Sequence, residues 1–150
     1  MHYRLYEPAD LHDLYAIEEV CFLPPERFTR RYMRQLIAGP NSATWVAEQE
    51  GTLRGFAIVE WAQQTSGLVA YVATIEVLPE FRKHGLGGEL LRRLEASANA
   101  ERANAIWLHV ATENASAIRL YERLRYSTSG RAENFYARNR PAAIYVKQLV

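Results

Sequence analysis

The segment from Ile75 to Gly88 constrains the fold of this chain more than any other. An apolar run ends at Val77, a basic turn with Arg82 and Lys83 follows, and closely spaced glycines lead into leucines that recur at helical spacing. A strand that turns directly into a helix is a building unit of α/β layer folds. Glycines let backbone amides approach a ligand, and a helix N-terminus attracts anions. The segment therefore predicts a strand–helix junction that can cradle a pyrophosphate.

Hydrophobic periodicity predicts the remaining elements, with Glu50-Gly51 as a hairpin turn and Thr65-Ser66-Gly67 as the turn before the third long strand. We expect Asp10 to cap the first helix, whose stripe contains Leu14, Ile17 and Glu18. The expected strands are 3–5, 43–48, 55–61, 68–77, 106–110, 126–131 and 143–149, and the expected helices are 10–21, 29–37, 86–103 and 114–124. This order, β-α-α-β-β-β-α-β-α-β-β, predicts one α/β domain over residues 1–150 with a central mixed sheet.

Composition bounds the class of protein. The chain has 150 residues, 49% of them hydrophobic, and a net charge of +1, which favours a globular core and argues against disorder and against general nucleic-acid binding. The single cysteine, Cys21, excludes an internal disulfide and favours a cytoplasmic location. The polar first residues and the lack of a long apolar run predict a soluble protein without a membrane partner. Residues 1–75 carry 6 basic and 9 acidic groups (−3), whereas residues 76–150 carry 12 and 8 (+4), which suits a polyanionic ligand near the glycine turn.

The glycine turn departs from two familiar phosphate-binding loops. A P-loop requires a Gly-Lys-Ser/Thr sequence, and this chain has no Gly-Lys pair. The dinucleotide fingerprint requires a third glycine where Leu90 stands. A plain strand-to-helix turn without a ligand remains the alternative on these residues alone.

Two stretches resemble signatures of the GNAT N-acetyltransferase superfamily. Arg82-Lys83-His84-Gly85-Leu86-Gly87 resembles its Gln/Arg-x-x-Gly-x-Gly/Ala acyl-CoA loop, and residues 107–121 resemble its second signature, with a strand residue, an asparagine and a helical tyrosine. The chain is most similar to the protein N-terminal acetyltransferases of the ribosomal-protein-alanine and N-terminal methionine types. The resemblance implies a single GNAT-type domain, an α/β (α+β) fold with a central mixed, splayed sheet flanked by helices on both faces. It also implies acetyl-CoA as cosubstrate, no metal, and a protein or peptide N-terminus as acceptor.

The resemblance also implies roles for individual residues. His109 would be the general base and Tyr121 the general acid, with Tyr71 as a second catalytic tyrosine across the cleft. Acetyl-CoA would contact the main chain of the end of the strand, the basic glycine turn, and two residues of the second signature: Ile75, Val77, Arg82, Lys83, His84, Gly85, Leu86, Gly87, Gly88, Asn114 and Tyr121. The acceptor would lie between Phe22 and Pro24 on one side and Tyr136 on the other.

The chemistry of acetyl transfer suits these residue types, although each has a purely structural alternative. The reaction needs a base for the amine, donors for the oxyanion and an acid for the thiolate, and histidine, backbone amides and tyrosine serve these purposes. His109 alternates with Leu108 and Val110, so it also fits a solvent-facing or core histidine. Tyr121 fits a core aromatic residue, Asn114 a helix cap, and Tyr71 an ordinary strand residue.

One departure from the resembling family lies after Tyr121. The relatives have Leu-Gly-Phe where this chain has Leu124-Arg125-Tyr126. A left-handed helix end costs a non-glycine residue about 1–2 kcal/mol, so this helix either ends differently or carries that strain. Two other functions stay open: acetylation of a small-molecule amine, such as a polyamine, amino acid or antibiotic, and non-catalytic binding of acyl-CoA by a regulatory module. We expect a monomer or weak homodimer.

Overall fold

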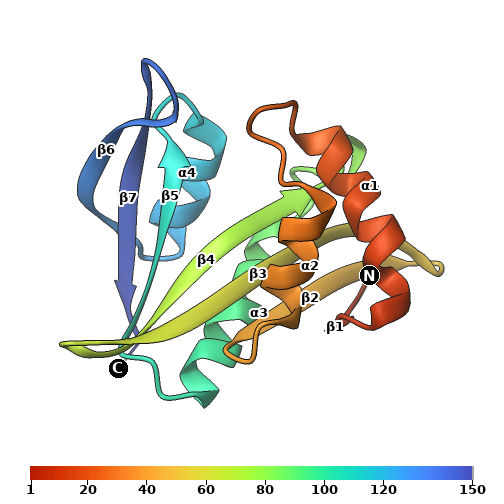
Figure 1. Ribbon diagram of the computed structural model, residues 1–150, viewed down its shortest axis with the longest axis horizontal. Helices are drawn as coiled ribbons and strands as arrows, with labels where there is room; N and C mark the ends of the chain where they lie inside the picture. Colours follow the sequence, from red (N-terminus) through yellow and green to blue (C-terminus); the bar gives the residue numbers. More distant parts are fainter. Residues whose placement is uncertain (150) are drawn as a thin grey trace.

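The computed structural model describes residues 1–149, and its order of strands and helices is the predicted one (Figure 1). The strands are β1 (His2–Leu5), β2 (Ser42–Gln49), β3 (Thr52–Gln64), β4 (Gly67–Val77), β5 (Ala105–Ala111), β6 (Ser127–Ala137) and β7 (Arg140–Gln148). The helices are α1 (Leu11–Cys21), α2 (Arg30–Ala38), α3 (Leu86–Ala100) and α4 (Ala115–Arg123), with short 3-10 turns η1 (Pro8–Asp10) and η2 (Pro79–Phe81). The bounds differ from the predicted ones by three residues or fewer, except that β6 ends at Ala137, six residues later than predicted.

The seven strands form one mixed sheet in the order β1-β2-β3-β4-β5-β7-β6. β4 and β5 run parallel and are joined by three residue pairs, from Val69↔Ala105 to Tyr71↔Trp107, after which the strands diverge (Figure 1). A register shift in the β3–β4 ladder leaves Ala73 unopposed, because Ile58 pairs with Thr74 and Val59 with Val72. Such a bulge bends its strand, and this one lies where β4 leaves β5. The predicted splayed, mixed sheet is therefore confirmed.

Helices cover both faces of the sheet and enclose two apolar cores. α1 and α2 lie on one face, where Leu14, Met33 and Phe56 are fully buried, and α3 lies on the other (Figure 1). The α3 core contains Leu90 and Leu94, and it continues to Tyr121 of α4. Burying a leucine side chain contributes about 1.5–3 kcal/mol, so these stripes hold the helices against the sheet. The glycine turn and the β4–β5 gap are therefore held by packed helices and strands.

The prediction that Asp10 caps the first helix was right about its position and wrong about its side chain. Asp10 stands at the N-cap position of α1, but its side chain makes no capping bond there. Its carboxylate instead accepts two hydrogen bonds from the Arg4 guanidinium, at 2.8 and 2.9 Å, and one from the Glu7 amide. The ion pair with a neighbouring strand outcompetes the cap, and the pKa of Asp10 is lowered mainly by Arg4. Asn114 does cap its helix, accepting from the amide of Ala117 at 3.2 Å.

The sequence left open whether the helix before Arg125 ends in a left-handed conformation, and the structure shows that it does. Arg125 adopts a φ of 72°, in the left-handed region. The Tyr126 amide donates to the Tyr121 carbonyl at 2.9 Å, and the Arg125 amide donates to Glu122 at 3.1 Å, which together form a Schellman motif. The helix therefore ends as a glycine-terminated helix does, with an exposed arginine in the glycine position.

Candidate active site

Tyr71 and His109 meet where β4 and β5 begin to part. The Tyr71 hydroxyl lies 2.8 Å from Nδ1 of His109. Tyr71 is paired with Trp107 in the β4–β5 ladder, and His109 follows two residues later on the same face of the sheet. Leu108 and Val110, which alternate with it, are buried on the opposite face. The structure thus brings together the two side chains that were predicted to lie across a cleft.

Aromatic rings and burial set the protonation state of this pair. Phe135 stacks on His109 with ring centroids 3.9 Å apart and planes 13° apart. Burial lowers the pKa of His109 and raises the pKa of Tyr71 to about 12. At neutral pH the imidazole is therefore neutral and the phenol protonated. When Nδ1–H donates to the Tyr71 oxygen, the Nε2 lone pair is left as the base, whereas a proton on Nε2 removes that capacity.

Tyr121 lies on α4, buried among other tyrosines. Its ring centroid is 6.0 Å from that of Tyr126 and 6.4 Å from that of Tyr145. Burial raises its pKa, and the neighbouring Tyr136 adds to the shift. Tyr136 also raises the pKa of Tyr71, so it lies near both tyrosines. Tyr121 is therefore a protonated core tyrosine, which is the state that a general acid needs.

The turn before α3 has the space and the amides for a pyrophosphate. Gly85 is the N-cap residue, with φ of 86°, and a Cβ added there would meet no atom within 4 Å. Cβ atoms added at Gly87 and Gly88 would contact the Leu120 side chain at 3.5 Å, an ordinary packing distance, so the open space lies at Gly85. Packing therefore does not fill the space before the helix, and the first-turn amides of a helix have no partner within it. This open, amide-lined turn with Lys83 and His84 exposed beside it fits the predicted acetyl-CoA site.

The end of β4 and the start of α4 border the gap between the splayed strands. Ile75 and Val77 lie beyond the last β4–β5 pair, so their main chain is not used by β5. Nε of Arg82 donates to the Val77 carbonyl at 2.9 Å, which places this guanidinium at the strand end. Oδ1 of Asn114 caps α4, and its Nδ2 amide is the group left for a cosubstrate.

The residues predicted to hold the acceptor come from two segments, the rims of the predicted acceptor site. Phe22 and Pro24 belong to the loop between α1 and α2, and Tyr136 belongs to β6. Arg140, at the start of β7, joins the rims, because it forms ion pairs with Glu26 of that loop and with Glu113. The Arg140–Glu26 ion pair brings the start of β7 to the loop that contains Phe22 and Pro24, and the acceptor roles of Phe22, Pro24 and Tyr136 stay predictions. Burial raises the pKa of Cys21, at the base of this loop, to about 11, so its thiol is a poor nucleophile.

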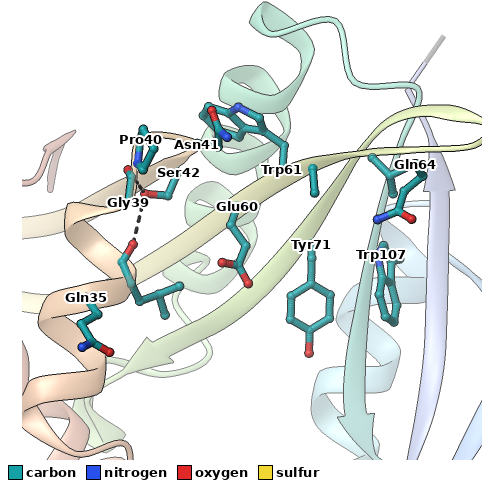
Figure 2. A pocket seen from close by; sticks show the side chains of 13 residues that line it. Gln35, Gly39, Pro40, Asn41, Ser42, Glu60, Trp61, Gln64, Tyr71 and Trp107 are labelled. Atoms are coloured by element: carbon teal, nitrogen blue, oxygen red, sulfur yellow. Dashed lines mark hydrogen bonds between the residues drawn. The ribbon is translucent and has the colours of Figure 1, made fainter.

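Three side chains near Tyr71 were not singled out from the sequence: Glu60, Trp107 and Phe135. A groove of about 560 Å³ continues from Tyr71 and Trp107 toward α2, and Glu60 lines it (Figure 2). The position of Glu60 could have been found from the sequence. Gln64 pairs with Gly67 at the β3–β4 turn, and counting back one pair at a time sets Glu60 opposite Tyr71. Trp107 lies two residues before His109 on β5, so the alternation of the strand places both side chains on the same face.

A pair of buried carboxylates lies under β4, on the α1 face. Glu18 and Glu76 are 1% and 2% exposed. Oε2 of Glu18 accepts from the Phe28 amide at 3.0 Å, and Oε2 of Glu76 accepts from the Thr74 hydroxyl at 2.8 Å. Burial, together with Glu18, raises the pKa of Glu76 to about 10. Within residues 1–149 the Oε1 atoms of both side chains have no hydrogen-bond partner, and a protonated Glu76 carboxyl can donate to Glu18.

Two kinds of site are not found in the described part of the chain. Residues 1–149 hold no group of three or more His, Cys, Asp or Glu side chains arranged for a metal ion. Over the same residues, no helix has the length and apolarity needed to cross a bilayer.

Comparisons with known proteins agree with this geometry. Residues 11–126 match the model of the acetyltransferase (GNAT) family. The N-alpha-acetyltransferase RimI of Mycobacterium tuberculosis is 31% identical over 113 residues, which cover 75% of this chain and 66% of that protein. N-alpha-acetyltransferase 60 of Xenopus tropicalis is 44% identical over 57 residues, or 36% of this chain. The chain spans only 24% of the length of this relative and 35% of its Danio rerio counterpart.

Solved structures share the fold across different named acceptors. The ribosomal-protein-S18-alanine N-acetyltransferase of Escherichia coli superposes with a TM-score of 0.86 at 24% identity, covering 99% of this chain and 93% of that one. An aminoglycoside 6'-N-acetyltransferase complexed with coenzyme A reaches 0.82 at 15% identity, covering 100% and 98%. The fold alone therefore does not choose the acceptor. The splayed sheet, the open glycine turn at its gap and the match over residues 11–126 lead to one assignment: this chain belongs to the acetyltransferase (GNAT) family.

Proposed function

We propose that this chain is an acetyl-CoA-dependent N-acetyltransferase whose acceptor is the α-amino group of a protein or peptide N-terminus. The observation that carries the proposal is the 2.8 Å contact between Tyr71 and Nδ1 of His109, at the mouth of the β4–β5 gap. The names of the RimI and N-alpha-acetyltransferase 60 relatives support the choice of acceptor. The single cysteine supports a cytoplasmic location.

The residues of the site divide the proton transfers of a direct attack between them. Bound acetyl-CoA supplies the thioester carbonyl and the thiolate leaving group. Nε2 of His109 accepts the proton that the amine loses as its nitrogen bonds to the carbonyl carbon, directly or through a water. Backbone amides at the end of β4 hold the developing oxyanion. The hydroxyl of Tyr121 donates a proton to the sulfur as the C–S bond breaks. The cycle closes when His109 releases the amine proton to solvent and Tyr121 takes up a proton, which restores its phenol.

The first part of the test identifies the acceptor. Peptides of one sequence are offered with a free or a chemically blocked α-amine, together with a panel of small amines, and the products are located by mass spectrometry. We expect acetylation of the free N-terminus alone. Modification of internal lysines in the blocked peptides, or of small amines alone, contradicts the proposal.

The second part tests the proposed acid and base. Tyr121→Phe and His109→Gln should each lower kcat by about 10²-fold, which is a typical effect of a proton-transfer group. Tyr3→Phe, on β1 at the far edge of the sheet, is the matched control and should leave kcat unchanged. Full activity of Tyr121→Phe contradicts its role as the acid.

A further inference from the structure

The groove beside Tyr71 has one charged residue in its lining. Aromatic rings of Trp61, Tyr71 and Trp107 contribute to its wall, and the polar residues Gln35, Asn41 and Gln64 border it. Glu60 is the single ionisable acid among the lining residues, and no basic residue lines the groove. A carboxylate among aromatic faces is the combination that attracts an organic cation, because the ring faces are negative as well.

Glu60 lies next to the proposed site of the reacting amine. Glu60 and Tyr71 are direct partners in the β3–β4 ladder, and Tyr71 and Trp107 are partners in the β4–β5 ladder. Residues opposite each other on neighbouring strands point to the same face, and the strands are about 4.8 Å apart. Figure 2 shows the Glu60 and Tyr71 side chains extending in the same direction from their strands. The carboxylate therefore lies one strand beyond the tyrosine that contacts His109.

Glu60 has no partner of its own within the described residues 1–149. It is half-buried, and neither an ion pair nor a side-chain hydrogen bond engages it, in contrast to the paired acids Glu26, Glu48 and Glu95. Burial raises its pKa, which is the cost of desolvating a carboxylate that nothing compensates. A cation entering the groove would supply that compensation.

We propose that this groove is the subsite for a cationic side chain that follows the reacting amine, so that the preferred acceptors carry lysine or arginine as their second residue. This inference rests on the proposed function. With the α-amine at the Tyr71–His109 contact, the next Cα of the acceptor lies 3.8 Å further along the chain. The four-carbon stem of lysine is long enough to cross the remaining strand spacing to Glu60. A polyamine presents the same chemistry, a primary amine with a second cation several bonds away, and the experiment separates the two sources.

The test compares acceptors that differ in one side chain. Three peptides with lysine, glutamine or glutamate at the second position, and spermidine, are assayed with the wild-type protein, Glu60→Gln and Glu50→Gln. Glu50 is an exposed acid at the tip of the β2–β3 hairpin, so its variant removes the same charge far from the groove. Thermal unfolding shows whether each variant folds. Binding of each peptide in the presence of coenzyme A is measured by calorimetry, which repeats the comparison without turnover.

We expect kcat/KM for the lysine peptide to exceed that of the glutamine peptide about tenfold, which corresponds to about 1.4 kcal/mol. Glu60→Gln should bring this ratio close to one, and Glu50→Gln should retain it. A wild-type ratio near one, or a ratio that survives in folded Glu60→Gln, overturns the inference while N-terminal acetylation itself stands. Glu60-dependent acetylation or binding of spermidine, with no peptide used, supports the cation subsite and overturns the peptide acceptor.

Discussion

Replacing Glu76 by glutamine should stabilise the protein at neutral pH and leave its stability unchanged near pH 4. In the folded chain, burial and Glu18 raise the pKa of Glu76 from 4.5 to about 10, so the side chain stays protonated at pH 7. In the unfolded chain the same group ionises near 4.5. Its contribution is therefore fully present below pH 4.5 and is lost as the pH rises toward 10. Each pH unit costs about 1.4 kcal/mol, which sets a ceiling of about 3.4 kcal/mol at pH 7.

Glutamine removes this cost, because it holds no titrating proton. The Nε2 amide of the glutamine can donate to Glu18, and its Oε1 can accept from the Thr74 hydroxyl, as the Glu76 carboxyl does. Since buried groups relax and admit water, we expect a gain of about 2–3 kcal/mol at pH 7. This gain corresponds to a rise in Tm of about 5–10 °C for a chain of this size.

Urea unfolding, followed by tryptophan fluorescence between pH 4 and 8, measures the effect. The free-energy difference between Glu76→Gln and wild type should grow with pH, and the exposed control Glu50→Gln should show no such trend. A difference that is constant over this range, or a loss of stability at pH 7, would mean that Glu76 is ionised in the folded state and would refute the reasoning.

Three further predictions address the backbone and the base. Arg125→Gly should raise the free energy of unfolding by about 1 kcal/mol because φ is 72°, whereas Arg125→Ala should give no gain in the same denaturation assay. Gly85→Ala should lower the free energy of unfolding by about 1–2 kcal/mol and raise KM for acetyl-CoA. The control Gly51→Ala, at a φ of 76° and in equally open space, should lose stability without a change in KM. Equal KM values for the two variants would contradict a pyrophosphate site at Gly85. Because burial lowers the pKa of His109, its ring should titrate below 6.5 when followed by NMR, and His109→Gln identifies its resonance. A midpoint above 6.5 would contradict the lowered pKa.

The element order and the face of His109 could be predicted because they depend on local periodicity. Alternation along β5 places His109 opposite Leu108 and Val110, and the helical spacing of leucines marks α3. The cap at Asn114 likewise follows from its own few residues. Roles for Tyr71 and Tyr121 came from resemblance, and periodicity alone could not separate them from core aromatics.

Contacts between distant segments could not be predicted. The Asp10 carboxylate binds the Arg4 guanidinium of β1 rather than the amides of its own helix, and this contact depends on how β1 packs beside the helix. Glu76 alternates with apolar Ile75 and Val77 as an exposed residue does, and nothing in β4 indicates that α1 places Glu18 over it. The hairpin register sets Glu60 opposite Tyr71 locally, but the groove itself also depends on the position of α2, which is a tertiary feature.

The divergence of β4 and β5 has a kinetic consequence. The glycine turn leads into α3 on one side of the sheet, whereas the groove at Tyr71 and Glu60 opens toward α2 on the other. Under the proposed function the two reactants therefore approach from opposite sides of the sheet and meet at the gap beyond Tyr71 and Trp107. Both binary complexes should consequently form, and either reactant can arrive first.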